Sequence, residues 1–109
     1  MFQDIRMNVI RTASNGIVNS ETIFDFSQEQ ELVFAKYSGG NIKKGYLVGN
    51  VKNNRLHFCY CQVRINGMMD HGASICEISF EDDKLILTEK FEMSSERGKE
   101  IGVNIFKEL

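Results

Sequence analysis

Four polar side chains in the second half of the chain could bind or transform a small molecule. Tyr60 and Gln62 are two residues apart in one strand-like segment, and Cys76 and Glu89 fall in the next two segments. A carboxylate such as Glu89, placed where water is excluded, is a candidate general acid or base, or a group that orients a ligand. The alternative is a structural carboxylate that is satisfied by Tyr60, by Gln62, or by Arg64 near the end of its segment.

A nucleophilic role for Cys76 is the less favoured interpretation. A neighbouring carboxylate opposes formation of the thiolate, and no histidine falls on the inner face inferred below to act as a base. A free cysteine otherwise packs like a small apolar side chain. We therefore expect Cys76 to pack in the interior, where it lines the candidate ligand site.

His57, Cys59 and Cys61 share the opposite face of their segment, because alternate residues of a strand point the same way. A zinc site usually needs a short chelating turn and a second pair of ligands, which this pattern lacks. The glycines at 39–40, 45 and 49 precede no helix and so predict no phosphate loop. We predict neither a metal nor a cofactor, and we place the His57 face on the outside of a sheet or in a dimer contact.

The composition indicates a globular protein. The 109 residues are 42% hydrophobic and 26% charged, with a net charge of -2 and scattered basic residues, so no nucleic-acid surface is expected. No apolar run approaches the roughly 20 residues of a membrane helix, and the first residues do not have the layout of a secretory signal. Three cysteines then indicate free thiols in a reducing cytoplasm. We expect one domain over residues 1–109.

Alternation of apolar and polar residues with a period of two dominates the chain, and turn signals interrupt it about every 8 to 12 residues. This pattern predicts an all-β fold, an antiparallel up-and-down meander of about eight strands that forms a closed or nearly closed, calycin-like barrel. A two-sheet sandwich is the alternative. The strongest turn signal is Asn15-Gly16. The expected strands are residues 7–13, 18–26, 31–38, 43–51, 55–64, 72–80, 84–93 and 101–106.

Three hairpin registers identify the inner face of this barrel. We take 53–54 and 82–83 as two-residue turns and 66–70 as a five-residue loop, which places Cys76 opposite Glu89, Tyr60 by Cys76 and Gln62 by Ser74. The three registers agree on one apolar face, and a slip of one residue in any hairpin would break the agreement. Glycines 45 and 49 fall on this face and either make room for rings or leave a cavity. The predicted face contains Leu47, Val51, Leu56, Phe58, Tyr60, Ile78, Phe80, Leu85, Leu87 and Phe91.

Several segments carry a family resemblance that covers most of the chain. They are Glu-Thr-Ile-Phe at 21–24, Tyr-Ser-Gly-Gly-Asn-Ile at 37–42, Gly-Tyr-Leu-Val-Gly at 45–49, Tyr-Cys-Gln-Val at 60–63 and Leu-Ile-Leu-Thr-Glu-Lys-Phe at 85–91. In these segments the chain resembles a group of bacterial proteins of similar length that often carry the name N-acetylglutamate synthase. Tyr37, in the second segment, joins Tyr60, Gln62, Cys76 and Glu89 as a ligand-binding candidate.

Three functions remain open at this point. The first is a non-enzymatic barrel that binds a small molecule in its interior, since eight-stranded barrels hold packed side chains or one small ligand. The second is a small-molecule enzyme with Glu89 as general acid or base and Tyr60 as its partner, which requires solvent access to the carboxylate. The third is a homodimer through a sheet edge or the His57 face, which a cluster of the outward residues Ile75, Ile101 and Phe106 would favour.

Overall fold

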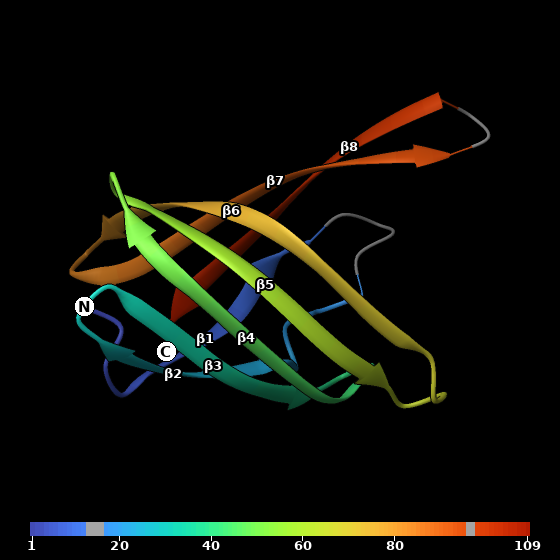
Figure 1. Cartoon of the computed structure of the whole chain (residues 1–109), viewed down its shortest axis with the longest axis horizontal. Helices are drawn as coiled ribbons and strands as arrows, with labels where there is room; N and C mark the ends of the chain where they lie inside the picture. The colour runs from blue at the N-terminus through green and yellow to red at the C-terminus, as the bar shows by residue number, and fades with distance from the viewer. Residues whose placement is uncertain (13–16, 96–97) are drawn as a thin grey trace.

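The computed structural model describes the backbone of residues 1–12, 17–95 and 98–109, and the side chains of residues 1–12, 17–90 and 102–109. Within this part of the chain, eight antiparallel strands follow one another around a closed barrel, in which β8 returns to pair with β1 (Figure 1). The predicted meander and its closure are confirmed, which excludes the sandwich. The strands are β1 (Ile5–Arg11), β2 (Ile23–Glu29), β3 (Leu32–Gly39), β4 (Ile42–Lys52), β5 (Arg55–Arg64), β6 (Met69–Glu81), β7 (Lys84–Ser95) and β8 (Gly98–Glu108).

Two tight turns produce the predicted registers of the β4–β5 and β6–β7 hairpins. Asn53 and Asn54 have φ values of 53° and 59°, and Asp82 and Asp83 have 51° and 63°. Two successive left-handed residues make the turn whose twist matches that of the flanking strands, and asparagine and aspartate tolerate this conformation. The predicted pairing of Cys76 with Glu89 is therefore confirmed. The expected Asn15-Gly16 turn lies outside the described residues.

The predicted register of the β5–β6 hairpin is wrong. Tyr60 pairs with Gly72, and Gln62 pairs with Asp70, where we expected Cys76 and Ser74 as their partners. The cause is Gly67, whose φ of 89° lets the chain close in a three-residue loop, with the Arg64 amide donating to the Met68 carbonyl. Asp70 consequently belongs to a strand and not to a loop.

This error keeps the inner face of β5 and β6 but changes which residues are neighbours on it. Each residue meets a partner four positions from the expected one, and an even displacement leaves every side chain on its own face. Phe80 is the exception on the predicted face, because it lies near the end of its strand and is 60% exposed. Phe106, which we expected to point outward, is buried in the core. The side chain of Phe91 lies outside the described residues.

The start of the second strand also differs from the expectation. Residues 18–22 do not extend the strand, because side chains of Asn19 and Thr22 compete for the backbone. The Asn19 Oδ1 accepts a hydrogen bond from the Glu21 amide at 2.9 Å, and the Thr22 hydroxyl accepts one from the Asn19 amide at 3.2 Å. β2 begins only after this turn, at Ile23.

The apolar core contains a cluster of aromatic rings. Phe24 stacks on Tyr37 with ring centroids 4.4 Å apart and meets the edge of Phe106 at 5.2 Å. Phe2, ahead of β1, is fully buried and packs against Phe26, so it closes the barrel end that carries the turns at 30–31, 53–54 and 82–83. We call this the closed end, and the end with the turn at 40–41 and the loop at 65–67 the open end.

The sheet is interrupted between β6 and β7. Their pairing stops at Cys76 and Glu89, although both strands continue. Beyond that point β7 pairs only with β8, and β8 meets β1 only from Ile105 onward. The outer halves of β7 and β8 thus form a two-stranded ribbon that diverges from β6 (Figure 1). We call the gap between residues 69–75 of β6 and residues 90–95 of β7 the β6–β7 split. No helix in the described residues is long and apolar enough to cross a membrane.

Replacing Phe24 by alanine should destabilise the barrel strongly, because the ring is almost completely buried in the aromatic cluster. We expect Phe24→Ala to lower the free energy of unfolding by about 3–5 kcal/mol, the usual cost of such a truncation. Phe80→Ala is the matched control and should change it by less than about 1 kcal/mol, since that ring is exposed. Urea denaturation measures both, and similar losses in the two variants would contradict this description of the core.

Candidate ligand-binding site

The interior changes from apolar to polar towards the open end. On β5, the inward side chains of Leu56 and Phe58 are buried, whereas Tyr60 is partly exposed. On β6, Cys76 is buried, and the inward residue Gly72 is partly exposed. Because these residues all face the inside of the barrel, their exposure means that solvent reaches the interior beside the β6–β7 split, whereas Gln62, the next inward residue of β5 towards the open end, is buried. A ligand-binding site in this barrel belongs in the open half.

One hydrogen-bonded chain crosses the open half from β3 to β6. The Tyr37 hydroxyl donates to Oε1 of Gln62 at 2.8 Å, and Nε2 of Gln62 donates to Oδ2 of Asp70 at 3.0 Å. Arg64 completes the chain through a fork, with Nε donating to Oδ2 of Asp70 at 2.9 Å and Nη2 donating to Oδ1 at 2.8 Å. Two-point contact of this kind fixes the orientation of both side chains.

The surroundings of Asp70 and Tyr37 determine the protonation states within this hydrogen-bonded chain. Hydrogen bonding from Arg64 lowers the pKa of Asp70, and the bond from Gln62 acts in the same direction. Burial raises the pKa of Tyr37 well above its usual range, and Tyr60 and Asp70 add to the effect. Asp70 is therefore an anion neutralised by its partner, and Tyr37 is a neutral hydrogen-bond donor.

A second polar cluster lies on the other side of the interior, on β7, β8 and the residues after β1. Nδ2 of Asn104 donates to Oε1 of Glu89 at 2.9 Å, and the Thr12 hydroxyl donates to Oδ1 of Asn104 at 2.8 Å. Glu89 is 9% exposed and is the β7 residue at which pairing with β6 stops. Its carboxylate is thus oriented by a neutral amide and lies beside the β6–β7 split.

The Glu89 carboxylate acts electrically on its neighbours across the interior. Burial raises the pKa of Tyr60, and the negative charge of Glu89 raises it further. Burial and then Glu89 likewise raise the pKa of Cys76 far above its usual range. The Cys76 thiol is consequently protonated at neutral pH, which opposes a nucleophilic role, and the side chain packs in the core as expected.

Two glycines make room for the two interior tyrosines. A Cβ atom at Gly45 would overlap the Tyr37 ring, and one at Gly72 would lie 2.9 Å from the Tyr60 hydroxyl. The expectation that Gly45 makes room for a ring is therefore confirmed. Gly49 does not make room for a ring in the same way, because a Cβ atom there would overlap the His57 carbonyl oxygen and the Phe58 Cβ atom.

The structure brings four of the five predicted ligand-binding residues to the open half. Tyr37 and Gln62 lie in the hydrogen-bonded chain between β3 and β6, and Glu89 lies in the second polar cluster. Burial raises the pKa of Tyr60, and the negative charges of Glu89 and Asp70 raise it further. Cys76 lies deeper, paired with Leu56 and Glu89. The continuous row from Tyr60 through Cys76 to Glu89 that we expected does not form, because the β5–β6 register differs. Whether these residues bind a ligand stays a prediction.

Three polar residues of the site were missed at the level of sequence: Asp70, Asn104 and Thr12. Asp70 had been assigned to a loop, and recognising Gly67 as the left-handed residue of a three-residue loop would have placed it opposite Gln62. Asn104 of β8 pairs with Glu89 of β7. Its spacing of two residues from the apolar Phe106 would have placed it on the same face of that strand. Thr12 follows β1 and carried no signal, since only the tertiary structure brings it to Asn104.

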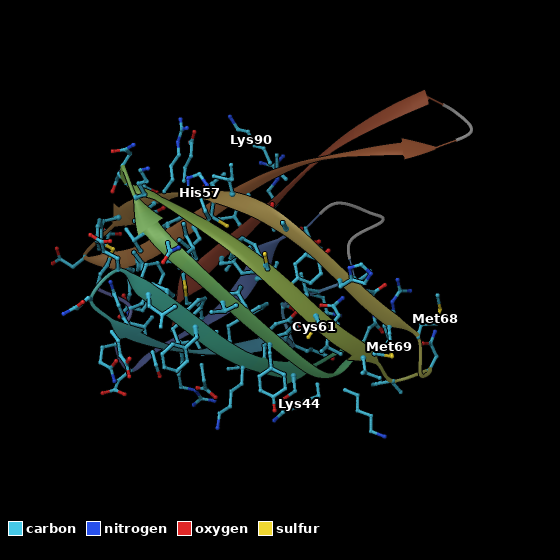
Figure 2. The ribbon with its side chains drawn as sticks, viewed as in Figure 1. Lys44, His57, Cys61, Met68, Met69 and Lys90 are labelled. Carbon is cyan, nitrogen blue, oxygen red and sulfur yellow. The ribbon has the colours of Figure 1, made fainter. Side chains whose placement is uncertain are left out.

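The histidine and cysteines of β5 lie on the outer face of the barrel. His57, Cys59 and Cys61 are all exposed, and Figure 2 labels the first and last of them along β5. All three cysteines of the chain are free. In the part of the chain that the structure describes, no group of three or more histidine, cysteine, aspartate or glutamate residues is arranged to hold a metal ion.

Comparison with protein families identifies the relatives of this barrel. The family model described as "Avidin-like protein" matches residues 1–109. The chain belongs to the avidin-like family. Avidin-like barrels are calycin-like and bind small molecules such as biotin, so the expected fold class and a small-molecule-binding barrel are both confirmed. No curated protein and no solved structure matches the chain.

The resemblance to proteins named N-acetylglutamate synthase is a wrong identification. The avidin-like model spans the whole chain, and nothing supports the synthase name. The segments that carried the resemblance are strands and turns of the barrel wall, built from alternating apolar residues and glycines. Such segments report the fold and not a reaction.

Asp70→Asn should remove an acid-sensitive contribution to stability. Because the folded-state pKa of Asp70 is lowered below its usual 3.8, the ion pair contributes stability above that pH and loses it as the pH falls through the folded-state value. The difference in unfolding free energy between wild type and Asp70→Asn should therefore be largest near neutral pH and shrink below about pH 4. Urea denaturation across pH 2–8 measures it. Glu31→Gln, in an exposed turn, serves as the control, and a difference that is independent of pH would contradict the assignment.

Proposed function

We propose that this avidin-like barrel is a non-enzymatic binding protein whose small-molecule ligand occupies the open half of the interior. The observation that carries the proposal is the partly exposed inward residues of β5 and β6, which lie between two ordered polar clusters. Both clusters are held in place by hydrogen bonds within the barrel before any ligand arrives. Preorganised polar groups on a rigid wall are typical of binding sites.

The groups available to a ligand are the Tyr60 hydroxyl and the Glu89 carboxylate. Tyr60 makes no hydrogen bond to another side chain among the described residues, and its ring stands beside Phe58 with centroids 6.3 Å apart. Asn104 occupies only Oε1 of Glu89. A ligand would therefore meet an aromatic wall, one hydroxyl and one carboxylate. The chain contains no tryptophan, so tyrosine and phenylalanine supply all the aromatic surface.

A binding role fits these groups better than an enzymatic one. The enzymatic alternative needs Glu89 to exchange a proton with Tyr60 as its partner, whereas among the described residues the side chain bonded to Glu89 is the neutral amide of Asn104. Its nearest thiol, Cys76, is buried and protonated. The three free cysteines support our further proposal that the protein works in the reducing cytoplasm.

A thermal-shift screen tests the binding role. Purified protein is melted against biotin, acyl-CoA, glutamate, fatty acids and divalent metals, and a ligand at about 100 times its Kd should stabilise the fold by about 2.7 kcal/mol. Glu89→Gln and Tyr60→Phe should each weaken the shift from a true interior ligand at least ten-fold in Kd. Glu77→Gln changes an exposed carboxylate on the outer face of β6 and should leave the shift intact. A hit that is abolished only by Glu77→Gln would place binding outside the barrel.

A homodimer through the outer face is the second candidate, and a row of apolar residues favours it. Phe34, Val48, Cys59 and Ala73 are consecutive cross-strand neighbours on β3 to β6, and all four are exposed. Two shallow hollows of about 770 and 700 Å³ meet along Val48 and Cys59. Contiguous apolar surface of this kind marks association sites. The row continues the His57 face on which we expected a dimer contact.

Val48→Lys tests this face. Sedimentation velocity should show wild-type protein as a dimer and Val48→Lys as a monomer, because a buried ammonium without a partner opposes association. Ile10→Lys is the matched control, since Ile10 is a similarly exposed apolar residue on β1, outside this row, and should leave the dimer intact. A wild-type protein that stays monomeric at high concentration would rule the dimer out.

A further inference from the structure

The β6–β7 split exposes a hydrogen-bonding edge of β6. The Ile78 amide donates to the Asn54 carbonyl, and the Met68 carbonyl accepts from the Arg64 amide, so the even-numbered residues of β6 direct their backbone groups to β5. In an antiparallel ladder the alternate residues bond to the opposite neighbour. The amides and carbonyls of residues 69, 71, 73 and 75 therefore point into the split, where β7 no longer meets them.

Among the residues that the structure describes, this edge lacks the usual protection against a further strand. Natural edges carry proline or lysine, or are covered by other elements. The chain has no proline, and residues 69–75 of β6 contain no lysine or arginine. Their one acidic residue, Asp70, points inward and is already paired with Arg64. In the part of the chain with described coordinates, nothing pairs with this edge, so an extended chain from outside can.

The side chains next to this edge define what an added strand would meet. On the outer face of β6, Met69 is 77% exposed and Ile75 is half exposed, and Met68 is exposed in the adjoining turn. Figure 2 shows Met68 and Met69 together at the β5–β6 turn, where they form an apolar rim, with Lys90 apart from them on β7. On the inner face the neighbours are the small residues Gly72, against which the Tyr60 ring lies, and Ser74.

The charge inside the split determines which inward-pointing side chain of an added strand would be favourable. Asp70 is neutralised by Arg64, whereas Glu89 has the neutral Asn104 as its hydrogen-bond partner. Glu89 stands where β6 and β7 separate, so its carboxylate is a negative charge at the inner end of the split that has no cationic partner among the described side chains. The influence of this charge on Tyr60 and Cys76 is consistent with that position. A cation complements it.

We propose that the β6–β7 split binds an extended peptide segment, which adds as a strand to the free edge of β6 and directs one basic side chain to Glu89. The inference rests on the proposed binding function and names the ligand class of the same interior. Strand addition derives affinity from backbone hydrogen bonds and specificity from alternate side chains. The preferred segment has apolar residues facing Met69 and Ile75, alternating with small polar residues around one lysine or arginine.

Fluorescence anisotropy with synthetic peptides tests this proposal on the intact protein. The probe is a labelled, end-blocked heptapeptide in which valine alternates with threonine and a central lysine. Two matched peptides replace the lysine by glutamate, or methylate the backbone nitrogens on the face that pairs with β6. We expect saturable binding of the probe and at least ten-fold weaker binding of each matched peptide.

Two pairs of protein variants locate the site. Ala73→Pro removes an amide that points into the split and should weaken the probe at least ten-fold, whereas Ala73→Val should keep its affinity. Glu89→Gln should reduce the preference for lysine over glutamate at least ten-fold, and the outer-face Glu77→Gln should not. If Ala73→Pro does not fold, the methylated peptide tests the same backbone pairing from the ligand side.

Each other outcome overturns the proposal. Equal binding of all three peptides would show adhesion to the methionine rim, and binding of lysine amide alone as tightly as the probe would show a site for small cations. Absence of probe binding overturns it as well. If the metabolite screen still yields an interior ligand in that case, only the peptide inference fails. If neither screen nor probe binds, the proposed function fails with it.

Discussion

The pairing of β8 with β1 is the contact on which the rest of this barrel depends. It joins the two ends of the chain in the sheet, from Met7 with Glu108 to Arg11 with Ile105, and so turns a meander with two edges into a closed wall. Closure encloses the aromatic cluster of Phe24, Tyr37 and Phe106. It also positions Asn104 of β8 beside Thr12 beyond β1, so one of the two polar clusters exists only because the wall closes.

The two ends of the barrel differ because their connections differ. Two-residue turns and the buried Phe2 close one end, whereas the β7–β8 ribbon departs from β6 at the other and leaves inward residues there partly exposed. Buried polar groups must be hydrogen-bonded, and here every buried polar side chain described has a partner. The polar clusters can therefore lie inside the open half without destabilising it. They remain oriented for a ligand.

The inner and outer surfaces of the barrel differ in their hydrogen bonding and in their charge. The interior of the open half contains an ion pair, two tyrosines and one carboxylate without a cationic partner among the described residues, all in fixed positions. The outer face of β3 to β6 carries the exposed apolar row of Phe34, Val48, Cys59 and Ala73. The first suits recognition of a defined ligand, and the second suits packing against another surface.

The sequence by itself determined the strand number, the alternation and the inner face, because a period of two and tight turns such as Asp82-Asp83 are local properties. It also predicted Tyr60, Gln62 and Glu89 as interior residues, and Tyr37 as a ligand-binding candidate. Only the tertiary structure decided which of them meet. The conformation of Gly67 replaced Cys76 by Gly72 as the partner of Tyr60, and closure of the barrel supplied Asn104 and Thr12 for Glu89. Period-two alternation survives an even register shift unchanged, so it fixes faces but not neighbours.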